Sequence, residues 1–101
     1  MKSKVSDKVV KYKSAYTFGR ALGLSPFEIE LIRQKKKIVE KLRKARESQG
    51  LSQSELAKMV LSHQPAIARM ESGQMSEVSL DFLCKVALAL DVSVTIRAKA
   101  A

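Results

Sequence analysis

The apolar positions of this chain recur at helical spacing in four stretches and then alternate near the C-terminus. The first stretch begins at Ser25, a helix-capping residue followed by proline and by Glu28 at capping-box spacing, and it meets no helix breaker before Gln49. Its apolar residues fall three, four or seven positions apart: Phe27, Leu31, Ile38, Leu42 and Ala45. They share one face, so the pattern predicts one long helix.

Three shorter helices are predicted after it. Gly50 ends the long helix, and Ser52 opens a second one with Glu55 at capping-box spacing. A third helix extends from about residue 63 to the terminating glycine at 73, and a fourth from a serine cap at 79 to residue 90. We expect their inward faces to contain Leu56, Met59, Val60, Ile67, Met70, Leu80, Leu83, Val86, Ala87 and Leu90. Cys84 follows the same rhythm and is predicted to be a buried small hydrophobe.

The last segment changes its period. Val92, Val94 and Ile96 alternate with polar residues, which is typical of a strand with one apolar face. A lone strand cannot satisfy its own backbone, so it needs the N-terminal arm or the same strand of a second copy, and we favour the second copy. The predicted organisation is a basic arm at 1–24, a helical domain with an N-terminal extension at 25–91 and a dimerisation strand at 92–101.

Charge points to a polyanionic partner. The 101 residues carry a net charge of +9. Up to Gly50 there are fourteen Lys and Arg against five Asp and Glu, whereas the remainder contains five of each. Nucleic acid is the most common partner of such a chain, and a solvated basic face is the alternative. For the triplet Lys35 to Lys37 the alternatives are a solvated face, phosphate contact and a partner protein.

Catalysis and metal binding are not expected. One cysteine and one histidine cannot form a disulfide or a metal site by themselves. The sequence contains no paired carboxylates, Cys/His couple or phosphate-cradling glycine loop, so we expect neither an enzyme nor a cofactor. It also lacks a signal sequence and an apolar run of about 18 residues, so the expected location is the cytoplasm, without membrane association.

The two short helices at 52–60 and 63–73, joined by a tight turn, predict a helix-turn-helix. In this geometry the second helix enters the DNA major groove by its N-terminal end. Gln64 can then read adenine through two hydrogen bonds, and Pro65 costs little because its missing N–H has no partner in a first turn. Ala68 permits close approach, and Arg69 can reach guanine or a phosphate.

The runs "LRKARESQGLSQSELAKMVLSHQPAIARMESG" and "SLDFLCKVALALDV" resemble the Cro/C1-type (XRE) helix-turn-helix proteins over residues 38–91. The resemblance implies an all-α, lambda-repressor-like bundle that binds operator DNA as a two-fold dimer. It implies a partly buried ion pair between Arg46 and Glu71 and a phosphate contact for Gln53. The predicted DNA-binding residues are Gln53, His63, Gln64, Pro65, Ala68, Arg69 and Gln74.

Three departures from the family pattern affect these expectations. Leu61 replaces the usual glycine of the turn, and His63 replaces the usual Ser or Thr cap, so Ser62 is an alternative cap. The loop "GQMSEV" has no cation, although many relatives bind phosphate there with lysines and arginines. We therefore expect the basic arm and the first helix to supply the phosphate contacts, with a steep salt dependence that removal of residues 1–24 reduces.

The ending V-S-V-T-I resembles that of HipB-type and some HigA-type antitoxins, whose strands pair over a dimer. The resemblance implies a repressor of its own operon that neutralises a toxin protein and associates with the nucleoid. Against this, a basic toxin would be repelled by a partner of charge +9. The alternatives are a stand-alone regulator of the XRE type and, in another functional class, an adaptor that bridges proteins.

Overall fold

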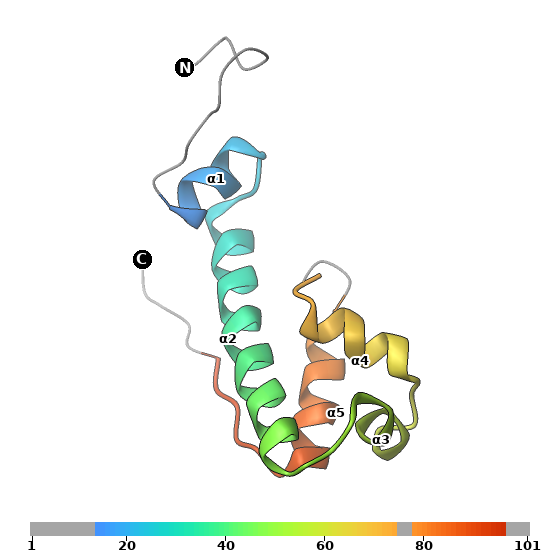
Figure 1. Cartoon of the computed structure of the whole chain (residues 1–101). Coiled ribbons are helices and arrows are strands. Elements are labelled where there is room, and N and C mark those ends of the chain that lie inside the picture. Colours follow the sequence, from blue (N-terminus) through green and yellow to red (C-terminus); the bar gives the residue numbers. More distant parts are fainter. Residues whose placement is uncertain (1–13, 75–77, 97–101) are drawn as a thin grey trace. The chain divides into compact units, whose positions relative to one another are not determined.

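The computed structural model describes residues 14–74 and 78–96, and this part of the chain contains five helices and no strand (Figure 1). The helices are α1 (Ala15–Ala21), α2 (Pro26–Ser48), α3 (Gln53–Met59), α4 (Gln64–Glu71) and α5 (Leu80–Leu90). The chain divides into two compact units, residues 1–30 and 31–101. None of the described helices is both long and apolar enough to cross a membrane. The five helices, with no strand among the described residues, confirm the prediction of an all-helical bundle.

In the first unit, α1 lies within the segment expected to be an arm. Its cap is Ser14, whose Oγ accepts the Thr17 N–H at 3.2 Å. Gly19 packs so closely on Ile29 that a Cβ at this position would lie 2.8 Å from Ile29 Cγ1. Such a separation is too short for two carbon atoms, so any other residue at this position would force the Ile29 side chain to move.

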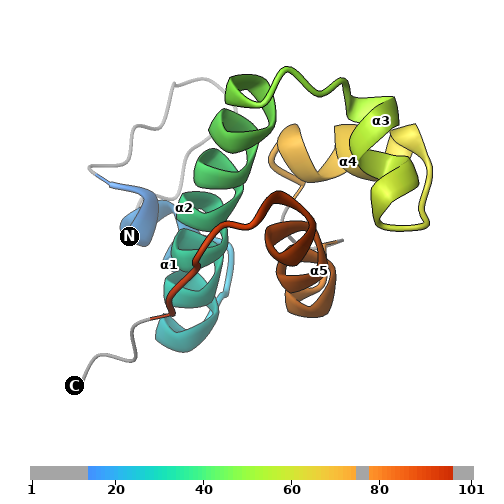
Figure 2. The same cartoon turned by 90° about the horizontal axis from the view of Figure 1, so that it is seen from below.

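In the second unit, the apolar stripes of α2, α3, α4 and α5 form one core, with α3 packed against α4 and α5 (Figure 2). The core residues are Ile38, Val39, Leu42, Leu56, Ala57, Val60, Ile67, Met70, Val78, Leu83, Val86, Ala87 and Leu90. Three helices begin as predicted: the capping box of Ser25 and Glu28 starts α2, that of Ser52 and Glu55 starts α3, and Ser79 caps α5. The core thus fixes α3 and α4 in position for the site described below.

The predicted C-terminal strand is not found within the described residues of the single chain. Residues 92–96 lie extended beside α2, as both views show (Figures 1 and 2). Val92 and Val94 pack on the core, and the Lys41 ammonium donates to the carbonyl oxygen of Ser93. The alternation of apolar residues predicts a sheet face, but in a single chain the same side chains are buried against a helix instead.

Several positions expected inside are exposed. The exposed fraction is 86% for Phe27, 42% for Leu31 and 49% for Met59. Cys84 is also exposed, which corrects the prediction of a buried thiol. Helical spacing places a residue on a stripe but does not give the width of that stripe, and these four residues lie at its edges or beyond the core.

Candidate nucleic-acid interface

A buried ion pair joins α2 to α4. Arg46 Nε donates to Glu71 Oε2 at 2.7 Å, and Arg46 Nη2 donates to Glu71 Oε1 at 3.0 Å. The two side chains are only 12% and 6% exposed, and Arg46 Nη1 also donates to the carbonyl oxygen of Leu51 at 2.7 Å. The hydrogen bond that Arg46 donates to Glu71 raises the pKa of Arg46. The two residues implied as a structural pair by the family resemblance therefore contact each other through two parallel hydrogen bonds.

Glu71 is also the start of a line of amide hydrogen bonds that reaches the surface. Gln53, the first residue of α3, donates from Nε2 to Glu71 Oε1 at 2.9 Å. Gln64, the first residue of α4, donates from Nε2 to Gln53 Oε1 at 2.7 Å. The buried ion pair thus holds the side chains at the N-terminal ends of both motif helices. The amide pair was not predicted, and its only sequence signal is a glutamine at the first position of each helix.

The remaining hydrogen-bonding groups of this line match what DNA presents. An amide has two N–H donors and one carbonyl acceptor. Gln64 uses one N–H within the chain, which leaves one N–H and Oε1, the combination that pairs with N7 and N6 of adenine. Gln53 retains one N–H, which suits a phosphate oxygen.

Helix α4 presents opposite faces to the core and to solvent. Ile67 and Met70 are fully buried, so they fix the helix against the domain. Six of the predicted DNA-binding residues lie on α4 or at its ends, and each is exposed or half-buried: His63, Gln64, Pro65, Ala68, Arg69 and Gln74. His63 is the N-cap by backbone conformation, but its side chain makes no cap hydrogen bond. Ser62 does not cap α4 in its place.

The turn between the motif helices is strained at one residue. Leu61 has a φ of 56° and is 94% exposed. Two hydrogen bonds close the turn: Leu61 N–H donates to the Lys58 carbonyl at 3.1 Å, and Ser62 N–H to the Ala57 carbonyl at 2.8 Å. Leucine therefore adopts the left-handed conformation for which relatives use glycine, and the turn keeps its hydrogen bonds.

A shallow hollow of about 270 Å³ lies on the other flank of α4, where the helix meets the start of α5. Its lining residues are Ser62, Ala66, Arg69, Val78, Ser79 and Phe82. Lys35 donates to the Val78 carbonyl at 2.8 Å, so this lysine of the basic triplet holds the end of the loop between α4 and α5. Residues 75–77, half of the predicted cation-free loop at 73–78, lie outside the described residues.

Comparison with known families agrees with this geometry. A model of the helix-turn-helix family matches residues 42–96, more than half of the chain. The chain belongs to the XRE-type helix-turn-helix family. Helices α3 and α4 are the two motif helices, and the chain is a DNA-binding transcriptional regulator. No curated protein and no solved structure matches the chain.

Proposed function

We propose that this regulator is a sequence-specific repressor that inserts the N-terminal end of α4 into the major groove of its operator. The observation that supports this most is the line of hydrogen bonds from Arg46 through Glu71 and Gln53 to Gln64. These hydrogen bonds restrict the side-chain amide of Gln64 before DNA binds, and a restricted side chain loses less conformational entropy on binding. Gln64 reads an adenine, Arg69 contacts a guanine or a phosphate, and Gln53 contacts a phosphate.

The other exposed residues of this surface have supporting roles in the proposal. Pro65 occupies the first turn of α4, where its missing N–H costs no helical hydrogen bond. Ala68 is small and half-buried, which permits close approach to a thymine methyl or the groove floor. His63 and Gln74, both exposed at the two ends of α4, contact the DNA backbone.

The repressor acts as a homodimer through residues 92–96. Within the described part of the chain, residues 94–96 form no backbone hydrogen bond, although they are extended. Unpaired extended backbone is a template for a strand from another chain. In a dimer, Val94 of each copy remains on the core while the backbone edges pair, and Ile96, which is 45% exposed, becomes covered.

The repressor is the antitoxin of a toxin-antitoxin pair in the cytoplasm. The V-S-V-T-I ending after the last helix, similar to HipB-type and HigA-type antitoxins, supports this part of the proposal. The test is a tagged pull-down from the native cells after nuclease treatment, with intact-mass analysis of the eluate. A stoichiometric small protein whose toxicity is suppressed by this chain is the expected result.

Two other results would each replace the antitoxin proposal. A homodimer without a protein partner that retains specific DNA when nuclease is omitted would identify a stand-alone regulator. A protein partner whose binding and biological effect survive the substitutions Gln64→Ala and Arg69→Ala, with no specific DNA recovered, would identify a bridging adaptor.

A further inference from the structure

The outward face of α2 between Arg33 and Lys44 concentrates positive charge. Its five cations are Arg33, Lys36, Lys37, Lys41 and Lys44, and its single carboxylate is Glu40. Spacing of four residues arranges these side chains in two rows, 33-37-41 and 36-40-44, which extend for about 17 Å along the helix. On the opposite side of the same helix, Ile38 and Leu42 are buried in the core shared with α3 and α4. We call this cation-bearing side the basic face.

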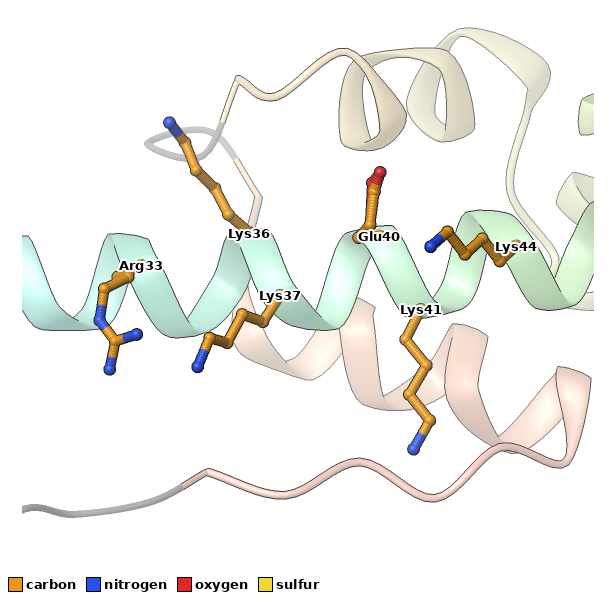
Figure 3. Close-up of a pocket in the computed structure, with 6 residues that line it drawn as sticks. All are labelled: Arg33, Lys36, Lys37, Glu40, Lys41 and Lys44. Carbon is orange, nitrogen blue, oxygen red and sulfur yellow. The ribbon is translucent and has the colours of Figure 1, made fainter. Parts of the chain in front are cut away.

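The basic face is a shallow groove and not a uniform field of charge. Its hollow measures about 590 Å³ and is lined mainly by the aliphatic carbons of the long side chains. Figure 3 shows Lys36 pointing to one side of the helix, and Arg33, Lys37 and Lys41 pointing to the other. Glu40 points to the same side as Lys36 (Figure 3), so a strip of methylene groups lies between a row of cations on one side and, on the other, a row in which Glu40 lies between Lys36 and Lys44.

Three of the five cations have no hydrogen-bond or ion-pair partner among the described residues, whereas Lys41 donates to the Ser93 carbonyl. Glu40 is held by Arg43, with Oε2 at 2.8 Å from Nη2, and this contact lowers the pKa of Glu40. Lys36, Lys37 and Lys44 form no hydrogen bond or ion pair with any described residue. Their charge is available to a partner.

We propose that the basic face binds an acidic amphipathic helix of a partner protein. Such a helix, with a narrow stripe of small apolar residues flanked by carboxylates, would cover the methylene strip and pair with cations on both sides. A nucleic-acid backbone fits less well, because its phosphates can pair with the cations but gain nothing from the methylene strip. The residues proposed to read DNA lie on α3 and α4, so this surface is separate from them and does not depend on the DNA-reading proposal.

The test uses the full chain and a synthetic helical peptide of about 18 residues with an alanine stripe flanked on both sides by glutamates. Titration in about 50 mM salt, followed by amide chemical shifts, should locate binding at residues 33–44. The double substitution Lys37→Glu/Lys44→Glu should weaken binding about tenfold or more. The matched control Lys58→Glu/Lys85→Glu changes the net charge equally at two exposed lysines on other helices and should cost no more than about threefold.

Three results would overturn the proposal. The first is the absence of binding. The second is equal affinity for a peptide of the same composition with its glutamates scrambled around the helix, which indicates attraction by net charge only. The third is a nucleic-acid surface: non-specific DNA of about 20 base pairs shifts the same amides and binds more tightly than the peptide. If thermal melting shows that the charge reversal disturbs folding, the milder variant Lys37→Gln/Lys44→Gln is used in its place. This variant should lower the affinity for the peptide several-fold.

Discussion

Removal of the Glu71 carboxylate should destabilise the domain severely. In Glu71→Ala the Arg46 guanidinium, 12% exposed, keeps the Leu51 carbonyl and the exposed Glu47 carboxylate at 3.7 Å but loses two hydrogen bonds and its buried counter-charge. Removing one partner of a buried ion pair costs about 3–5 kcal/mol. For a domain of this size each kcal/mol corresponds to about 4–8 °C, so the midpoint of thermal unfolding should fall by at least about 12 °C.

The control for this prediction removes a carboxylate that contacts the same arginine but is exposed. Glu47 Oε2 lies 3.7 Å from Arg46 Nη2, and the Glu47 side chain is 52% exposed. Because solvent screens such a pair, Glu47→Ala should cost less than about 1 kcal/mol. Both variants lose one negative charge, so the difference between them measures burial and not net charge.

A double substitution tests whether the stability lost in Glu71→Ala comes from leaving the buried charge of Arg46 without its partner. Arg46→Met/Glu71→Leu removes both charges and fills the space with apolar atoms, so it should recover most of the stability that Glu71→Ala removes. Circular dichroism melts and urea titrations of the four proteins provide the comparison. If Glu71→Ala melts within about 3 °C of Glu47→Ala, the buried-pair argument is wrong.

Four further outcomes are expected. Gln64→Ala should weaken operator binding by about 1–3 kcal/mol and relax specificity at one base pair, as measured by selection and fluorescence anisotropy; equal weakening at all positions would contradict base reading. Leu61→Gly should raise stability by about 0.5–1 kcal/mol, since it relieves a positive φ at an exposed side chain, and a lower melting temperature would refute the strain. The hydrogen bond from the Ser52 N–H lowers the pKa of Glu55, so its stabilisation exists above the unfolded-state pKa and disappears as pH falls through the folded-state pKa. Urea titrations of wild type and Glu55→Gln should therefore differ at neutral pH and converge in acid. Replacing the lysines within residues 1–13 by glutamine should reduce the slope of log K against log salt by about 0.9 for each phosphate that the arm no longer neutralises, and an unchanged slope would exclude the arm from DNA binding.

The sequence predicted α2 to α5 well because local signals agree with tertiary packing there, whereas α1 lies in the segment expected to be an arm. The capping box at Ser52 and Glu55, the cap at Ser79 and the glycines at 50 and 73 all mark helix ends near those observed. The apolar stripe of α5 is correct except at Cys84. Each of these features depends on residues within one or two turns, so periodicity and capping chemistry are sufficient to find them.

Other features could not be obtained from local patterns. The alternation at 92–96 is the same whether its apolar side faces a sheet or a helix, so only the fold distinguishes them. Lys35 belongs in the sequence to a triplet with two exposed lysines, but it holds the Val78 carbonyl 43 positions away. The contact between Gln53 and Gln64 likewise depends on the angle between α3 and α4, which the sequence does not specify, since Leu61 occupies the turn.

The hydrogen bonds that run from Arg46 through Glu71 and Gln53 to Gln64 connect the stability of the domain to DNA reading. A substitution at the buried end should change both properties, and one at the exposed end should change only DNA reading. Gln64 is exposed and ends the line, so its removal should change DNA affinity and leave folding almost unaffected. Glu71 is buried at the centre of the line, where it holds both Arg46 and Gln53, so its removal should change both properties. A residue that never touches DNA can therefore alter base recognition through two hydrogen bonds, because it determines which orientations the reading amide adopts before binding.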